Sequence, residues 1–444
     1  MREEDLTNFL NIQHNLTHCK RTDLKGAIPS SYAALTKLED LRIGDLNGED
    51  STLNFLVNLT SLSILSLRSS QVNGEIQSQI GMFPNLQSLD LSFNKLTRSI
   101  PNSFQDSQSL HFLYLGSNML TGEIPSNIIT PQLRALDASF NAITGNLPAN
   151  FDKVGRSLTC HKTYILYLFY WNVVGILVNG DGLLDGKAPG ISQCLQSDKK
   201  CTEKFPINSF AVKCGDSQQI SSDGAKFDDN SETLGASSIY TSSNNNWAVS
   251  NTGSFISNPN GPQYTAQTAS QIIDTLDSEL YKTARISPNS LRYYGLGLRM
   301  EDIMSNFIFL KFKWIIPSHG EALGERVVQD FNIKKEAGGS KRALVKLFEA
   351  NVTNTNIDIH IKWAGKGTCC IPVQSTLGLL VSAIRVSQVS NSSGSSNDNK
   401  RVGIAIEAVS AMALNEPNEQ ISVRALIFET WKQDKERYAV GMYV

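Results

Sequence analysis

The feature that most constrains the fold is a repeat of 24 residues in the first third of the chain. Leu38, Leu62, Leu86 and Leu110 stand in register, and Leu133 follows one residue short of the period. A repeat of about 20 to 30 residues is typical of a solenoid, in which each unit buries its apolar face against its neighbours. We therefore expect a stack of short, similar units in this region.

The best-formed units indicate which side chains face the interior. One unit reads Leu86-x2-Leu89-x-Leu91-x2-Asn94, and the next repeats this spacing from Leu110 onward. This is the leucine-rich repeat pattern, in which alternate leucines point inward from a short strand. The Asn is expected to bond to backbone groups where the chain turns away from that strand. The pattern predicts a cap and partial first repeat over residues 1–34 and a leucine-rich-repeat solenoid over 35–152.

A solenoid has one long concave face, and arrays of this kind usually bind macromolecules or peptides there. The outward residues of each predicted strand would line that face. The candidates for ligand contact are Arg42, Arg68, Asp90, Phe93, Tyr114, Asp137 and Phe140. Because the row is chemically mixed, an ordinary solvated surface is the alternative interpretation.

Charge and cysteine spacing exclude several kinds of partner. A net charge of -2 at pH 7 gives no reason to expect nucleic acid, which requires a basic patch. The seven cysteines show no C-x2-C pair of the kind that binds zinc, so we predict disulfides, no metal and no cofactor. The disulfide candidates are Cys194, Cys201, Cys214, Cys369 and Cys370, with their connectivity left open.

Four Asn-x-Ser/Thr sequences favour passage through the secretory pathway. The glycosylation candidates are Asn15, Asn58, Asn351 and Asn391. The charged start of the chain lacks the apolar segment of a signal peptide. The apolar stretch from Tyr164 to Val178 is shorter than the about 20 residues that cross a bilayer. We therefore expect neither a signal peptide nor a clear membrane span here.

After the repeats, residues 153–204 show no regular periodicity and are interpreted as an irregular junction. Alternation then appears, with Ile357, Ile359 and Ile361 separated by Asp358 and His360. Short alternating segments between turn-forming residues favour a β-sandwich over residues 205–386. Residues 387–444 are interpreted as a Ser/Asn-rich linker and tail. The fold class is thus mainly β, a solenoid followed by a sandwich.

Specific strings in the second half resemble a known family. The clearest are Tyr293-Tyr-Gly-Leu296 and Trp363-Ala-Gly-Lys-Gly-Thr-Cys-Cys-Ile-Pro372. They are similar to the malectin-like domain of plant leucine-rich-repeat receptor-like kinases, where that domain follows an extracellular repeat array. The chain departs from the family at Gly297, where a Cys is usual. It also departs over residues 298–327, where a core strand is expected to be missing or rebuilt.

The resemblance implies the ectodomain of a plasma-membrane receptor that senses a carbohydrate or peptide, with a co-receptor or a second copy as partner. The kinase motifs themselves do not occur in this sequence, so we predict no catalysis by this chain. A secreted decoy or co-receptor of the same two domains, or a non-functional truncated product, is the alternative. A glycan-modifying enzyme would need paired carboxylates across a cleft, and no such pair can be named.

A sandwich that binds sugars stacks aromatic rings on the apolar face of the sugar ring. The candidates for carbohydrate contact are Tyr240, Tyr264, Tyr293, Tyr294 and Trp363. The alternative interpretation is that most of these rings anchor the core or the turns.

Overall fold

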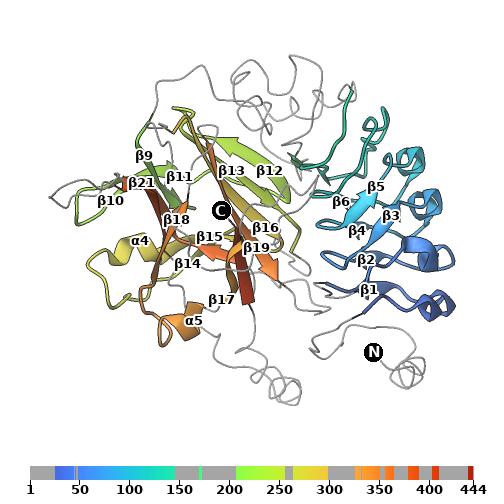
Figure 1. Ribbon diagram of the computed structural model, residues 1–444, viewed down its shortest axis with the longest axis horizontal. Helices are drawn as coiled ribbons and strands as arrows, with labels where there is room; N and C mark the ends of the chain where they lie inside the picture. The colour runs from blue at the N-terminus through green and yellow to red at the C-terminus, as the bar shows by residue number, and fades with distance from the viewer. Residues whose placement is uncertain are drawn as a thin grey trace, which may run out of the picture.

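The computed structural model is mainly β and consists of a stack of short parallel strands beside a larger body of antiparallel sheets (Figure 1). The fold class predicted from the sequence is confirmed. The structure describes residues 26–44, 46, 49–145, 170–172, 207–255, 264–298, 326–331, 333–350, 356–364, 379–389, 403–409 and 439–443.

The solenoid carries one parallel sheet along its concave side, and each repeat adds one strand to it. The strand order is β1 (Asp40–Arg42), β2 (Ile64–Ser66), β4 (Ser88–Asp90), β6 (Phe112–Tyr114), β7 (Ala135–Asp137) and β8 (Tyr170–Asn172). The 3-10 helices are η1 (Ser30–Ala34), η2 (Leu53–Leu56), η3 (Ser78–Met82) and η4 (Asn102–Asp106). Strands β3 (Asn73–Glu75) and β5 (Lys95–Thr97) pair in a second, two-stranded parallel sheet. The central leucines Leu65, Leu89 and Leu113 are in register and fully buried.

The repeated Asn residues satisfy backbone groups inside the solenoid, as the sequence predicts. Asn118 donates from Nδ2 to the carbonyls of Leu115 at 2.9 Å and Leu91 at 3.0 Å. Its Oδ1 accepts the backbone N–H of Leu96 at 3.1 Å. Asn94 makes the corresponding bonds one repeat earlier. Each such Asn therefore bonds to backbone groups of two adjacent repeats. These groups lie where the chain leaves the strand, so strand pairing does not satisfy them.

The solenoid sheet continues into the segment predicted to be an irregular junction. Strand β8 pairs in parallel with β7, with Leu136 opposite Trp171. A three-residue strand is too short to show a recognisable alternation of apolar and polar residues, so the sequence interpretation missed it.

The second body is a sandwich of two six-stranded sheets, with a three-stranded sheet beside them. One large sheet has the order β10 (Gln219–Ile220), β11 (Lys226–Asn230), β9 (Ser209–Cys214), β21 (Ala383–Val389), β22 (Gly403–Val409) and β18 (Val345–Ala350). The other has the order β12 (Ser237–Thr241), β13 (Trp247–Thr252), β16 (Ser290–Leu296), β19 (Asn356–Ala364), β23 (Ala439–Tyr443) and β17 (Arg326–Phe331). The smaller sheet contains β14 (Thr265–Gln267), β15 (Thr283–Ser287) and β20 (Leu379–Val381), and short helices are α4 (Ser278–Lys282) and α5 (Ile333–Glu336).

The sandwich core lies between the large sheets and includes Trp247, Tyr293 and Ile384, all fully buried. Gly295 is required there because a Cβ atom at this position would lie 2.3 Å from the ring of Phe210. Such a close approach of strand and ring leaves no room for a side chain.

Two strands come from the segment predicted to be a linker and tail. β22 lies between β21 and β18, and β23 lies between β19 and β17. The tail interpretation of residues 387–444 is therefore wrong for 403–409 and 439–443. Alternation of Ile404 and Ile406 with smaller or charged residues suits a strand, but the segment had no family resemblance to support that reading. The stretch over residues 298–327, where a core strand was expected to be missing or rebuilt, lies outside the described residues except for Leu298 and the first two residues of β17.

No helix within the described ranges is long and apolar enough to cross a membrane.

Candidate functional site

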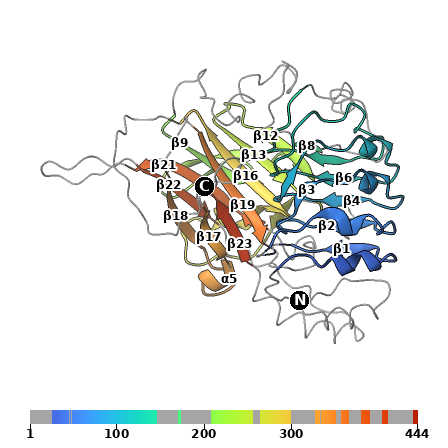
Figure 2. The same ribbon diagram turned by 45° about the vertical axis from the view of Figure 1, so that its right-hand side comes forward.

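Strands β13 and β16 are buried along their whole length, although only one of their faces looks into the sandwich core. On β16, Leu291 and Tyr293 belong to the core cluster. Because successive side chains alternate, Ser290, Arg292 and Tyr294 lie on the opposite face. That face is covered by the concave side of the solenoid, and Figure 2 shows β12, β13 and β16 beside the solenoid strands.

A polar cluster joins the two bodies where β2 and β4 end. Arg68 donates from Nη1 to Oδ1 of Asn289 at 2.5 Å. The Nδ2 of Asn289 in turn lies 3.4 Å from both Oδ2 of Asp90 and Oγ of Ser92. These groups are buried, so each bond is made away from water. Loss of one partner would leave the other buried without that hydrogen bond.

Two phenylalanine rings of the solenoid also contact the sandwich. Phe93 stacks on His360 with ring centroids 5.6 Å apart and an interplanar angle of 22°. Phe140 lies under the guanidinium of Arg292, whose Cζ is 3.7 Å from the ring centroid. Both phenylalanines have left-handed backbones, with φ of 60° and 54°, and occupy the turn that follows their strands. This turn aims both rings away from the solenoid core.

An apolar cluster completes the contact at the last described repeats. Tyr114 and Ala135 of the solenoid pack with Phe255, Tyr264 and Ile286 of the sandwich. At the same edge, the Ser237 hydroxyl donates to the Leu136 carbonyl at 2.9 Å.

Asp137 is a buried carboxylate at this contact. It is 4% exposed, and its Oδ1 accepts the backbone N–H and the hydroxyl of Ser139 at 3.0 and 2.6 Å. Burial raises the pKa of Asp137 from 3.8 to about 6, against the lowering effect of Ser139 and Arg292.

The concave-face candidates therefore serve a contact within the chain. Arg68, Asp90, Tyr114 and Asp137 are buried against the sandwich or beside it, so they do not form a free ligand surface in this arrangement. Phe93 and Phe140 stack on sandwich side chains. Arg42 differs: it lies on the first strand and pairs with Asp40 at 2.6 Å.

Three of the predicted sugar-contacting rings are anchors instead. Tyr264 is 4% exposed and donates to the Gly253 carbonyl at 3.1 Å. Tyr293 is fully buried and donates to Oδ1 of Asn230 at 3.1 Å. Tyr294 is buried on the face that meets the solenoid. The prediction is wrong for these three, because Tyr293 and Tyr294 lie on a strand that is buried on both faces and Tyr264 packs into the apolar cluster with Phe255. Trp363 lies near the end of β19, and its side chain is outside the described set.

Tyr240 is the half-buried ring of that set. It lies on β12, the edge strand, and its ring is 5.8 Å from the buried ring of Trp247. Asp229 and Glu232 are exposed and lie close by, and their charges add to burial in raising the pKa of Tyr240. Buried Arg285 holds the segment just after β11 by donating to the Glu232 carbonyl at 2.9 Å. Tyr240 is thus a half-buried ring on an edge strand, within the electrostatic reach of two exposed carboxylates.

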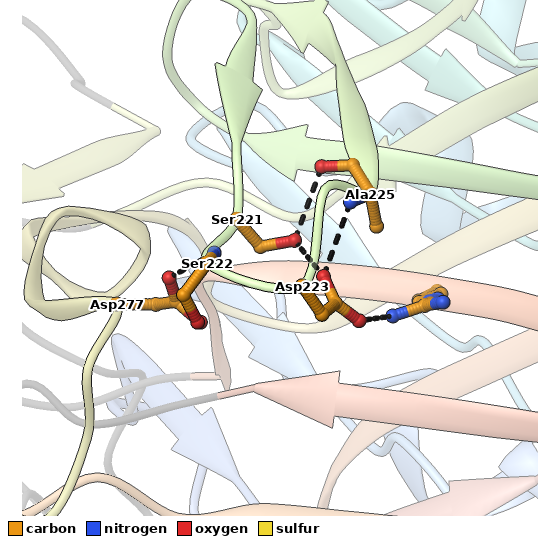
Figure 3. A network of polar contacts seen from close by, with 6 residues as sticks. Ser221, Ser222, Asp223, Ala225 and Asp277 are labelled. Carbon is orange, nitrogen blue, oxygen red and sulfur yellow. Dashed lines mark hydrogen bonds and ion pairs between the residues drawn. The ribbon is translucent and has the colours of Figure 1, made fainter.

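A polar network at the turn between β10 and β11 fixes the start of β11 (Figure 3). Asp277, next to α4, accepts the backbone N–H of Ser222 at 2.6 Å and its hydroxyl at 3.0 Å. Asp223 accepts from the Ser221 hydroxyl and from Nη1 of Arg385 at 2.5 Å, and these bonds lower the pKa of Asp223. The turn is thereby tied to two other elements, which steadies the strand that carries Asp229.

Cys214 carries a free thiol, in contrast to the predicted disulfide. It is fully buried in the sandwich core, and burial raises its pKa to about 11. Asn58, a glycosylation candidate, is exposed. The other predicted sites lie outside the described residues: Cys194, Cys201, Cys369, Cys370, Asn15, Asn351 and Asn391. Among the residues described, no group of three or more His, Cys, Asp or Glu could hold a metal ion.

Comparison with known proteins agrees with this architecture. Residues 208–317 and 321–384 match the malectin domain, and residues 60–120 match the leucine-rich repeat. A probable LRR receptor-like serine/threonine-protein kinase of Arabidopsis thaliana is 31% identical over 355 residues, which cover 77% of this chain. The chain is homologous to plant leucine-rich-repeat receptor-like kinases.

The homology covers a limited part of those receptor-like kinases. This chain spans 32% of the length of that relative and 21% of a second Arabidopsis thaliana receptor-like kinase, which is 36% identical over 218 residues or 46% of this chain. Among solved structures, the Arabidopsis receptor kinase HAESA, in complex with the peptide hormone IDA and the co-receptor SERK1, is 30% identical. That match covers 35% of this chain and 24% of HAESA, with a TM-score of 0.30.

Sequence reasoning missed Asn289, Arg292 and His360, which join the two bodies. One signal was present for Arg292: it is the charged residue of a segment that otherwise carries aromatic, apolar and small residues, and a charge on such a strand indicates a partner surface. Asp229 on β11 and Glu232 just after it were missed because exposed acidic residues carry no signal of their own.

Proposed function

We propose that this chain is the ligand-binding extracellular part of a plasma-membrane receptor-like kinase, and that its ligand is a carbohydrate that stacks on Tyr240. The homology to receptor-like kinases and the order of repeats before malectin domain support the receptor role. The observation that carries the ligand class is the half-buried Tyr240 ring with Asp229 and Glu232 beside it.

A sugar needs a flat apolar platform for its C–H face and acceptors for its hydroxyls. The Tyr240 ring offers the platform, and Trp247 supports it from the core. Asp229 and Glu232 offer acceptors, and Arg285 holds the end of β11 in place by donating to the carbonyls of Asn230 and Glu232. The site as proposed binds and positions a ligand without a reaction.

The test uses the full chain, secreted from a eukaryotic host, on an array of plant cell-wall oligosaccharides. The tightest oligosaccharide is then measured by calorimetry against three variants. Tyr240→Ala should weaken binding about tenfold, since an aromatic contact contributes about 0.5 to 1.5 kcal/mol. Tyr240→Phe should keep most of the affinity because the platform remains.

Leu276→Ala is the matched control, since Leu276 is 91% exposed and lies in the loop before α4. It should bind as the wild type does. Equal binding by Tyr240→Ala and the wild type would overturn the proposed site. An array without hits, together with saturable binding of a peptide library member, would replace the carbohydrate with a peptide.

A further inference from the structure

A buried carboxylate of the solenoid, Asp137, lies beside the sandwich residues Arg292 and Tyr294. Asp137 lies on the concave face of β7, and its Oδ1 bonds are both made to Ser139 of the same solenoid turn. With the sandwich in place, Asp137 is 4% exposed. The carboxylate therefore keeps its local bonds on closure but loses its water, which disfavours the charged form.

The ionisable groups facing Asp137 come from both bodies. On the solenoid these are Asp90 and Tyr114, and on the sandwich they are Arg292 and Tyr294. Arg292 is the cation of this set, and its charge is already shared: Nη1 pairs with Oδ2 of Asp358 at 2.6 Å, and the guanidinium covers Phe140. Asp90 repels a second negative charge. The contacts made on closure therefore offset only part of the hydration free energy that the Asp137 anion loses.

We propose that the contact between solenoid and sandwich is proton-linked, with Asp137 taking up a proton as the two bodies close. The closed arrangement is then more stable in acidic water than in neutral water. The raised pKa of Asp137, about 6 in the closed form, agrees with this geometry.

The sign follows from linkage. Well below 3.8, the ordinary pKa of an Asp side chain, Asp137 is protonated whether the bodies are open or closed, so closure is at its strongest. Between that value and about 6 the open form loses its proton and the closed form keeps it, and the closure constant falls about tenfold per pH unit. Above about 6 both forms are ionised, and the constant levels off.

Closure can be followed in the full chain by energy transfer between two dyes. Met82 is 67% exposed on η3 and Leu276 is 91% exposed in the sandwich, so each can be replaced by an azido amino acid and labelled without disturbing a core. Urea titrations between pH 4.5 and 7.5 give the midpoint at which energy transfer is lost. Far-UV circular dichroism in parallel reports unfolding.

The wild-type midpoint should rise as the pH falls from about 6.5 to 4.5. Asp137→Asn has nearly the same shape and cannot ionise, so its midpoint should lose this rise and stay near the acid value of the wild type. Asp106→Asn, an exposed carboxylate of the same solenoid, is the control and should keep the wild-type profile.

The test uses only the difference in urea midpoint between the variants. It is therefore valid whether the two bodies separate before the chain unfolds or together with it. An unchanged pH profile in Asp137→Asn would overturn the proposal. Should that variant fail to fold, Ser139→Ala provides the test: it removes a donor to the anion, and the rise should move to higher pH. A profile that does not move would contradict the proposal.

Discussion

Arg68 and Asn289 lie 221 residues apart in the sequence and share a buried hydrogen bond of 2.5 Å. Arg68 follows a solenoid strand, whereas Asn289 precedes β16 of the sandwich. The Asn amide also reaches Asp90, so one side chain bridges a cation and an anion of the solenoid. This bridge makes the two domains one structural unit at the concave face.

Asn289→Ala should therefore weaken the contact between the domains. It removes the acceptor of a buried guanidinium and leaves it without that bond, at a cost of about 1 to 3 kcal/mol. The urea midpoint for loss of energy transfer between labels at positions 82 and 276 measures this. Asn102→Ala, on an exposed surface of η4, is the control. Equal midpoints for the two variants would show that the bridge does not hold the domains.

Asn118→Ala should destabilise the solenoid itself. The substitution removes the acceptor of the Leu96 N–H inside the stack, whereas the carbonyls of Leu91 and Leu115 keep their bonds from Asn94 and Asn141. We expect the free energy of unfolding to fall by about 1 to 3 kcal/mol, because a buried polar group that loses its partner costs about that much. Chemical denaturation followed by circular dichroism is the measurement. A loss no larger than that of Asn102→Ala would refute the structural role of the Asn.

Gly295→Ala should disrupt the sandwich core. Its new methyl group would lie 2.3 Å from the Phe210 ring and 2.8 Å from Ile357, so the strand or the ring must move. Overpacking of this kind costs about 1 to 3 kcal/mol or more. Gly44→Ala is the matched control, because its nearest neighbour is 3.5 Å away. Thermal unfolding of both variants should show a large loss for the first alone.

The Cys214 thiol should remain protonated and unreactive in the folded protein at neutral pH. Its pKa rises from 9.0 to about 11 on burial, so its contribution to stability is present below pH 9 and is lost between pH 9 and about 11. Alkylation followed by peptide mass spectrometry should leave Cys214 unlabelled until urea unfolds the sandwich. Labelling at the rate of an unfolded peptide at pH 8 would contradict the burial.

The sequence could predict what is repeated or local. The 24-residue period identified inward leucines such as Leu89 and the structural Asn118, because each repeat meets the same neighbours. Family strings located the sandwich around Tyr293 and Gly295. Strands β22 and β23 were misread, since a strand far from the family match shows only a short alternation.

The candidate site was harder to predict, because its burial comes from a second domain. Asp137 reads as an ordinary outward residue of a repeat, and nothing near it in the sequence indicates Arg292 or Phe140 beside it. Tyr294 reads as an accessible ring for the same reason. Burial by a distant partner surface leaves no local periodicity, and only the assembled fold reveals it.

The most direct test of the account is carboxyl footprinting of the full chain, in which a water-soluble carbodiimide couples exposed carboxylates to an amine and mass spectrometry gives the rate at each residue. If the sandwich covers the concave face, Asp90 and Asp137 should react at least about tenfold more slowly than exposed Asp50 and Asp106 of the same solenoid. Equal rates at all four carboxylates would show that the concave face is open to water and would contradict the account.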